Sequence, residues 1–334
     1  MKNPSLLTAA LVALSALAHA QTVTVTTAAD TIDINASTGT VADLPGPDGE
    51  VSFSEALIAT NNTPGHQTIE FGIGTGNVLL SSITGYYWRA YDTVTVDAST
   101  QQGTVSLWYW DLYLNADDCT LIGFDGGEFW FTASNGLAIG NTGVNLNLSG
   151  PGGHRVEGNT GGTIKIAGAC NDNVLVGNTV QRIRVQGGSG NVVGGPHPED
   201  RNFVTGYGTW NVSSGLPSGT AFEIVGTTGL LVENNSIGTT PDGLAQGNAA
   251  CTIGIGIQGV NDDLVVRDNL IGGIKAVGIG TWAGYLFGNA VILWGSGGSN
   301  IELSGNTIGL DATGEPLLGS VWGIDVGTAN GSGL

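Results

Sequence analysis

One short stretch brings together residue types that could cleave a polysaccharide. Asp262 and Asp263 precede a run of aliphatic residues, and Arg267 and Asp268 follow that run. If the aliphatic residues point inward from a strand, Arg267 points outward, with carboxylates at both ends. Paired carboxylates serve as acid and base in glycosidases, and a lyase combines Ca²⁺ with an Arg or Lys base. These four residues are our candidate catalytic groups, although an Asp pair at a strand start also satisfies the backbone N–H groups of a turn.

A second set of residues has the chemistry of a ligand-binding surface. Asp117 and Asp118 follow the aromatic run Trp108, Tyr109 and Trp110. Exposed Trp and Tyr rings provide flat platforms for sugar rings, whereas buried ones pack in a core or stack on neighbouring strands. Both interpretations remain open for this run.

Two arginines, Arg182 and Arg184, alternate with aliphatic residues. A period of two places both guanidinium groups on the outward side of a strand. There they could contact a ligand, or they could form ion pairs with acidic side chains on adjoining strands. Glu233 and Arg267 are a second candidate ion pair of this kind.

Metal binding has little support in the sequence. Asp242 and Asp311 each lie in a bend, where a carboxylate and carbonyl oxygens could bind Ca²⁺, but both are also ordinary turn residues. The His residues are isolated and the three Cys residues are widely spaced, so they form no transition-metal pattern. We expect no resident cofactor, with Ca²⁺ as the one candidate.

Many short strands must position these residues. Glycine accounts for 57 of the 334 residues, and asparagine is also abundant. Both tolerate the left-handed backbone angles that turns require. From about residue 150 onward one sequence pattern recurs. It consists of a short β-branched run, then Gly or Asn, then another short run. Such irregular self-similarity indicates a solenoid. Examples are Val156-Glu157-Gly158-Asn159, Val174-Leu175-Val176-Gly177-Asn178 and Glu302-Leu303-Ser304-Gly305-Asn306.

Short strands joined by Gly and Asn bends predict an all-β fold, a right-handed parallel β-helix. Each coil, or rung, hydrogen-bonds to the next in parallel, and alternate side chains form a stacked aliphatic core. Asn at one bend position can stack on Asn of the next rung. The scarcity of two-residue hairpin loops argues against an antiparallel barrel or sandwich. A propeller or sandwich is the alternative.

A helix is expected only near the N-terminal end. Ser52 and Glu55 fit a capping box, which predicts a short helix over residues 53–61. This helix would cover the first rung and block edge-to-edge association. Its residues available for burial are Phe53, Ala56, Leu57, Ala59 and Thr60.

The first residues predict bacterial export. Lys2 precedes an apolar run that ends in Ala18-His19-Ala20, which is typical of a cleaved signal peptide over residues 1–20. This run is too short to span a membrane, and no later stretch is suitable. We therefore expect a secreted or cell-surface protein without membrane insertion.

The net charge restricts the classes of partner, whereas the cysteine content leaves the disulfide state open. The formal net charge is −19 at pH 7 with only 9 Lys and Arg residues, so a basic footprint for nucleic acid is missing. Cys119, Cys170 and Cys251 fit either one disulfide with a free thiol or three buried unpaired thiols.

We expect three segments: the signal peptide over 1–20, an N-terminal cap with the first rungs over 21–115, and β-helix repeats over 116–334. No capping device is visible after the last strand-like run. Either the sequence is incomplete there, or the last rung meets solvent or a partner. The expected state is a monomer unless a partner covers that rung.

The N-terminal region resembles the CSLREA motif region of exported bacterial right-handed β-helix proteins. The similarity covers residues 22–27, 48–62 and 68–71, and two later phrases over 235–243 and 306–314 are similar to the repeats of such proteins. The resemblance implies a β-helix and export, but no single activity. Ser52, Glu55 and Ala56 match the motif, whereas Val51, Phe53 and Ser54 replace its Cys, Leu and Arg.

Two functional hypotheses follow. In the first, the protein is a structural or binding module that contacts extracellular polysaccharide or another cell-surface component along one flank of the solenoid. In the second, it is a polysaccharide lyase or glycoside hydrolase that acts in a groove of the β-helix. The sequence shows no concentrated catalytic constellation, which favours the first hypothesis.

Overall fold

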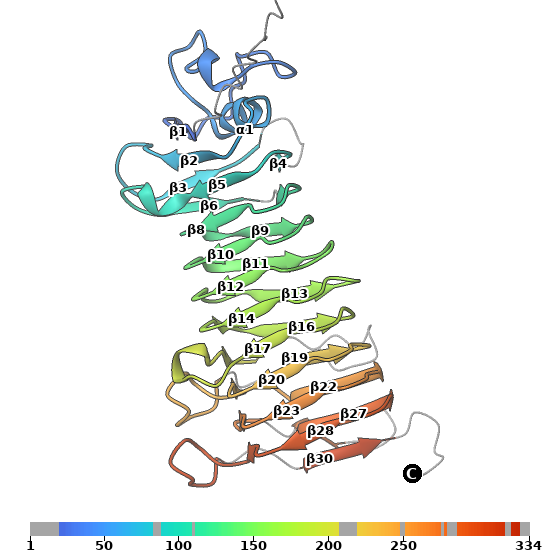
Figure 1. The fold of residues 1–334 in the computed structure, drawn as a ribbon. Coiled ribbons are helices and arrows are strands. Elements are labelled where there is room, and N and C mark those ends of the chain that lie inside the picture. Colours follow the sequence, from blue (N-terminus) through green and yellow to red (C-terminus); the bar gives the residue numbers. More distant parts are fainter. Residues whose placement is uncertain are drawn as a thin grey trace, which may run out of the picture.

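The computed structural model describes residues 20–82, 88–108, 111–206, 219–247, 251–274, 277–278, 286–317 and 322–327. Over these residues the chain winds as an all-β parallel solenoid, with the rungs stacked along one axis (Figure 1). Neighbouring strands of a sheet belong to successive rungs, as the sequence predicts. The right-handed sense remains the expectation for parallel crossovers.

One side of the solenoid is a sheet of eleven described strands, all paired in parallel. Most of its strands have three residues, which suits a side between two tight bends. In order along the axis they are β1 (Thr22–Val25), β2 (Gln67–Phe71), β5 (Val94–Asp97), β8 (Thr120–Ile122), β10 (Leu137–Ile139), β12 (Arg155–Glu157), β14 (Val174–Val176), β17 (Val192–Gly194), β20 (Leu231–Glu233), β23 (Val265–Arg267) and β28 (Glu302–Ser304).

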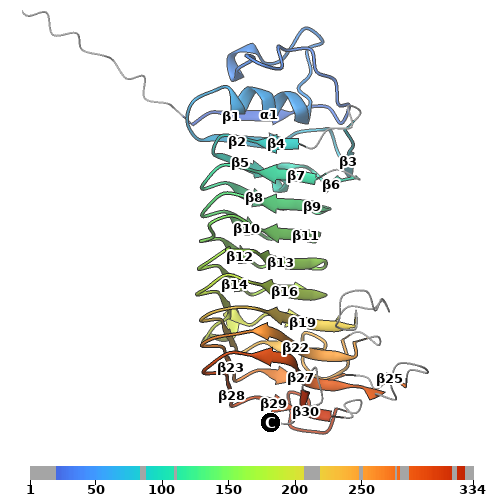
Figure 2. The same cartoon turned by 90° about the vertical axis from the view of Figure 1, so that its right-hand side faces the viewer.

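A second side is a sheet of ten described strands, also parallel, with generally longer strands. Figure 2 shows most of them stacked one below another on the same side. They are β4 (Trp88–Ala90), β7 (Asp111–Leu114), β9 (Asp125–Phe131), β11 (Thr142–Leu148), β13 (Thr163–Ala167), β16 (Arg182–Gln186), β19 (Thr220–Val225), β22 (Ile253–Val260), β27 (Asn289–Gly297) and β30 (Trp322–Gly327).

Shorter elements complete the rungs. Five two-residue strands form a third side in the C-terminal half: β15 (Thr179–Val180), β18 (Phe203–Val204), β21 (Ser236–Ile237), β24 (Leu270–Ile271) and β29 (Thr307–Ile308). The remaining elements are the parallel pair β3 (Val78–Leu80) and β6 (Val105–Leu107), the antiparallel pair β25 (Val277–Gly278) and β26 (Leu286–Phe287), and the 3₁₀ helices η1 (Val41–Asp43), η2 (Ala98–Thr100) and η3 (Pro198–Asp200).

Strict alternation of side chains produces the core. In β13, Ile164 and Ile166 are buried while Thr163, Lys165 and Ala167 are partly exposed. The inward residues of successive rungs stack on one another, so that one aliphatic and aromatic column fills the solenoid. Burial of this apolar surface is the main stabilising term of the fold.

Asparagines occupy one buried bend position on successive rungs. The side-chain amide of Asn141 donates to Asn159 Oδ1 at 2.8 Å, and Asn159 donates in the same way to Asn178 at 3.0 Å. Each ladder oxygen also accepts the backbone N–H of the asparagine before it. This confirms the predicted stacking of Asn on Asn. The ladder continues through Asn202, Asn235, Asn269 and Asn306.

Rung length changes along the solenoid. Successive ladder asparagines from Asn141 to Asn178 are separated by 18 and then 19 residues, whereas Asn202, Asn235 and Asn269 are separated by 33 and then 34. The ladder keeps the same hydrogen bonds in both regions. The additional residues of the longer rungs are therefore insertions between strand positions that recur in every coil.

The helix α1 (Phe53–Asn61) lies over the first rung, above β1 and β2 in Figure 2. Ser52 Oγ accepts the backbone N–H of Glu55, and the Glu55 carboxylate accepts the backbone N–H of Ser52. The predicted bounds, capping box and covering role are therefore confirmed. The residues expected to be available for burial are all buried: Phe53, Ala56, Leu57, Ala59 and Thr60.

The three cysteines are free and buried, which matches the second of the two alternatives. Burial raises the pKa of each thiol, and that of Cys251 reaches about 12. These thiols are therefore packing groups at neutral pH. Within the described ranges, no helix has the length and apolar character needed to cross a membrane.

Candidate functional site

The outward face of the ten-stranded sheet carries a straight column of polar and aromatic side chains, which we call the outer strip. The strand register aligns one residue from each of seven neighbouring strands, β4 to β19. All seven point away from the core because their neighbours in sequence are the buried residues. The column is Arg89, Tyr113, Trp130, Asn147, Lys165, Arg184 and Glu223.

The first part of the outer strip is a stack of one cation and two aromatic rings. The guanidinium carbon of Arg89 lies 5.0 Å from the centre of the Tyr113 ring. The rings of Tyr113 and Trp130 stack nearly parallel, with centroids 5.7 Å apart. Both aromatic side chains are partly exposed. The stack therefore presents aromatic surface and hydrogen-bonding groups to solvent along three neighbouring strands.

A carboxylate beside the stack holds both rings. Asp111 Oδ2 accepts the indole N–H of Trp130 at 3.1 Å and the Tyr113 hydroxyl at 3.3 Å. Asp111 and Trp130 therefore fix the orientation of the stack across adjacent strands.

Glu128 is the register partner of Asp111 on the next strand, so two carboxyl groups face outward side by side. Its pKa is raised by burial and by the charge of Asp111, while a hydrogen bond from Asn147 and the charge of Lys165 lower it. The donating Asn147 Nδ2 lies 3.0 Å from Glu128 Oε1. The pair thus places the Asp111 carboxyl group, which accepts two hydrogen bonds, beside a Glu128 carboxyl group that holds its proton more tightly than usual.

Further along the strip, several donors converge on the buried carboxylate of Glu223. Arg182 and Arg184 both form ion pairs with it, the latter through Nε at 3.0 Å, and Gln186 donates at 3.2 Å. This confirms the expectation that the two arginines pair with an acidic side chain on an adjoining strand. Two guanidinium groups share one carboxylate, so the cluster keeps a net positive charge.

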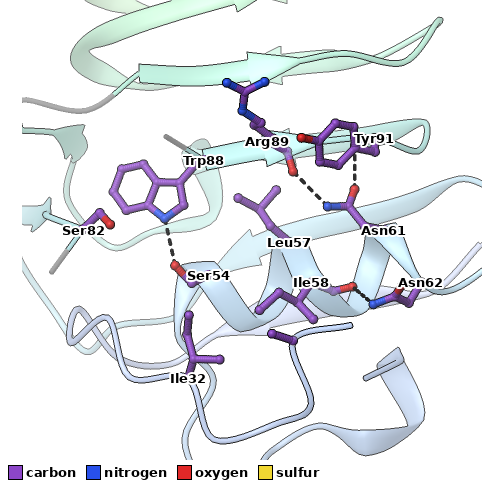
Figure 3. A pocket seen from close by; sticks show the side chains of 11 residues that line it. Ile32, Ser54, Leu57, Ile58, Asn61, Asn62, Ser82, Trp88, Arg89 and Tyr91 are labelled. Atoms are coloured by element: carbon purple, nitrogen blue, oxygen red, sulfur yellow. Dashed lines mark hydrogen bonds between the residues drawn. The ribbon is translucent and has the colours of Figure 1, made fainter. Parts of the chain in front are cut away.

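A pocket of about 550 Å³ lies at the other end of the strip, between α1 and β4 (Figure 3). Leu57, Ile58 and Trp88 make it mainly apolar, and Arg89, the first residue of the strip, also lines it. The Asn61 side chain joins helix and strand by donating to Arg89 O at 2.9 Å and accepting the Tyr91 N–H at 2.6 Å.

The four candidate catalytic residues do not belong to the outer strip. Arg267 ends β23 of the eleven-stranded sheet, and the three aspartates lie in the bends on either side of that strand. Asp262 accepts the Ser299 N–H at 2.8 Å, and Asp263 accepts from Asn300 at 2.8 Å. Arg267 points outward, as predicted, and forms the expected ion pair with Glu233 at 2.9 Å. Asp263 and Asp268 have positive φ angles, as bend residues do. Their role in catalysis stays a prediction.

The candidate binding residues near position 110 are divided between two corners of the coil. Trp108 follows β6 and is 49% exposed. Asp117 and Asp118 instead precede β8, where Asp117 accepts the Ser134 N–H at 2.7 Å and Asp118 has a positive φ. Tyr109 and Trp110 lie outside the described residues.

The two candidate calcium ligands accept hydrogen bonds from residues of their own turns. The Thr240 hydroxyl donates to Asp242 at 2.6 Å and the Thr313 hydroxyl donates to Asp311 at 2.7 Å. These hydrogen bonds, together with those from the backbone N–H groups of Leu244 and Thr313, lower the pKa of both carboxyl groups. In the part of the chain that the structure describes, no three His, Cys, Asp or Glu side chains group in a way that could hold a metal ion. Calcium binding stays a prediction.

Sequence reasoning missed the paired carboxylates and the stacked aromatics of the outer strip. A signal for them is present, because the strands β7 and β9 both contain an acidic–apolar–aromatic–apolar pattern. The two patterns are Asp111-Leu112-Tyr113-Leu114 and Glu128-Phe129-Trp130-Phe131, and their residues are in register. Comparing the outward residues of successive rungs, rather than short motifs along the chain, would have identified them.

Comparisons with family models, with curated proteins and with solved structures each found no match for this chain. The resemblance to CSLREA-region proteins therefore stays a prediction. The architecture rests on the strand pairing of the structure, and the functional argument rests on the outer strip.

Proposed function

We propose that the protein is an exported or cell-surface module that binds extracellular polysaccharide along the outer strip. The observation that carries this proposal is the column itself, with one polar or aromatic side chain on each of seven strands in register. Parallel strands lie about 4.8 Å apart, so the column extends over about 29 Å. A surface of this shape suits an extended polymer better than a compact metabolite.

The chemistry of the strip is consistent with sugar recognition. Amide, carboxylate and guanidinium groups hydrogen-bond to hydroxyl groups, and the rings of Tyr113 and Trp130 offer apolar contact. A nucleic acid is a poor alternative, because a chain with only 9 Lys and Arg residues has no basic footprint for a phosphate backbone.

Affinity electrophoresis of the mature protein in gels containing neutral and acidic polysaccharides tests the proposal. We expect at least one polymer to retard the protein, and Trp130→Ala to weaken that binding by about fivefold or more, since aromatic contacts of this size are worth about 1 kcal/mol or more. Trp108→Ala is the matched control, because it removes an exposed indole outside the strip. Retardation that survives Trp130→Ala, or no retardation by any polymer, would refute the proposal.

A second candidate function, glycoside hydrolysis, is favoured by the pairing of Asp111 with Glu128. Register partners on adjacent strands have Cα atoms about 4.8 Å apart, which is compatible with the carboxyl separation of about 5 Å in retaining enzymes. Glu128 would donate its proton to the leaving oxygen while the Asp111 carboxylate attacks the anomeric carbon and the glycosidic bond breaks. Water deprotonated by Glu128 would then release the sugar from Asp111.

A reducing-sugar assay on the same polymers separates the two functions. Hydrolysis predicts new reducing ends with wild type and their loss in Glu128→Gln, with retardation in the gel retained. Binding without new reducing ends supports the module and excludes the hydrolase for those polymers. The proposed export has its own test, because N-terminal sequencing of exported protein should begin at Gln21.

A further inference from the structure

A hollow of about 540 Å³ lies at the edge of the outer strip, where β11, β13 and β16 begin. Glycine forms its floor at Gly143, Gly161 and Gly162, all of which have positive φ angles. A Cβ atom on Gly162 would come within 1.8 Å of Val144 O, so a side chain there would clash with the backbone. The stacked turns are therefore bare of side chains, and this keeps the hollow open.

The wall of the hollow is cationic. Arg182 and Arg184 both line it, and their side chains keep 12% and 26% of their surface exposed. Lys165 is the register partner of Arg184 on β13 and adds a third positive charge on the same face. The acidic groups that face this cluster are Glu223, which accepts from both arginines, and Glu128, which interacts with the charge of Lys165, so three cations face two carboxyl groups and a net positive charge remains.

Neutral hydrogen-bonding groups complete the site. Asn145, Thr163 and Gln181 line the hollow beside the arginines. Asn145 Oδ1 accepts the Thr163 N–H at 3.0 Å, which holds the two residues of adjacent strands together. A polar hollow with fixed guanidinium groups is suited to a carboxylate or sulfate group, because arginine binds such oxyanions through parallel hydrogen bonds.

We infer that this hollow binds the anionic group of an acidic polysaccharide whose backbone lies along the outer strip. The inference rests on the proposed function and adds the class of ligand. Arg184, on the far wall of the hollow, is three strands along the axis from Trp130, or about 14 Å, so sugar and anion contacts fall on different residues of one polymer. The negative charge of the rest of the surface opposes a polyanion elsewhere, which restricts binding to this cluster.

Binding to a matched pair of polymers tests the inference. Polygalacturonate and its methyl ester share one backbone, but only the first carries free carboxylates. We expect isothermal titration to show wild type binding polygalacturonate at least tenfold more tightly than the ester. Arg184→Gln should remove that difference. Gln181→Trp, which places a bulky side chain at the exposed rim of the hollow, should weaken binding to the acidic form as well.

The outcomes separate this inference from the proposal beneath it. Equal binding of both polymers by wild type, or tenfold selectivity that survives Arg184→Gln and Gln181→Trp, overturns the anionic site and leaves the glycan-binding strip intact. If Trp130→Ala also binds both polymers like wild type, the strip itself is refuted. Arg155→Gln is the matched control, because it removes an exposed arginine on the eleven-stranded sheet and should leave the selectivity unchanged.

Discussion

The asparagine ladder inside the solenoid and the outer strip on its surface share one register but have opposite chemistry. The ladder repeats one residue type on successive rungs, with amide hydrogen bonds of 2.8–3.0 Å. The strip changes residue type at nearly every rung.

Burial explains the difference. An asparagine in the ladder must satisfy polar groups that water cannot reach, and an amide of the same length on each rung accomplishes this. Most side chains of the strip reach solvent, so their identity is free to serve a ligand, whereas Glu223 is buried as the counterion of two arginines. A column that repeats one residue type therefore indicates a structural role. A polar column whose residue type changes from rung to rung indicates a binding surface. The following predictions test this contrast.

The largest effect is expected from Asn178→Ala in the middle of the ladder. The side chain accepts from Asn159 and donates to Val156 O, Val176 O and Asn202 Oδ1. Its loss leaves several buried groups without partners, so unfolding in urea should show a loss of about 4 kcal/mol. Asn145→Ala removes an exposed asparagine from the same region and should cost under about 1 kcal/mol. Equal costs would contradict the contrast.

Glu223→Gln should produce the next largest effect, because it leaves two partly buried arginines without their counterion. The Glu223 side chain is 6% exposed, and both guanidinium groups depend on it. Removing one partner of a buried ion pair costs about 3 kcal/mol. Thermal unfolding monitored by circular dichroism provides the measurement, and an unchanged transition would show that this part of the strip is not structural.

His154 permits a test of pH dependence in a shorter second ladder. Its Nδ1 accepts the Gly136 N–H at 2.9 Å, and its backbone N–H donates to Asn173 Oδ1 at 2.9 Å. Burial lowers the pKa of His154 below its ordinary value of 6.5, although an interaction with the Ser149 backbone opposes this effect. The unfolded chain therefore binds a proton as the pH falls through 6.5 while the folded chain does not. The free energy of unfolding therefore decreases as the pH is lowered through that window.

His154→Asn should retain the ladder contacts and remove this contribution. Denaturant unfolding of both proteins between about pH 7 and about pH 5 would then show the variant losing less stability on acidification. Parallel pH profiles would indicate that His154 is not the group responsible.

The smallest effect is expected from Arg155→Gln. Arg155 pairs with Glu157 at 2.8 Å on the outward side of β12, with side chains 48% and 46% exposed. Exposed pairs contribute under about 0.5 kcal/mol, so the midpoint of unfolding should scarcely change. A large loss would show that exposed ion pairs outside the strip also contribute substantially to stability.

The local elements of this protein could be read from the sequence. Alternating residues such as those of β13 define strands, Asn and Gly mark the bends, and Ser52 with Glu55 defines the start of α1. These signals are local because backbone angles, capping and side-chain alternation depend on a few neighbouring residues.

Only the tertiary structure decides which residues come together in the outer strip and the hollow. The sequence contains Arg182, Arg184 and Glu223, but their contact depends on a strand register that crosses a separation of about 40 residues. Asp111 and Glu128 become neighbours for the same reason. Rung length varies from 18 to 37 residues between ladder positions, so no fixed period in the sequence brings these side chains together. The stacking of the rungs sets the partners, because each strand hydrogen-bonds to the next in a single register that keeps the core buried.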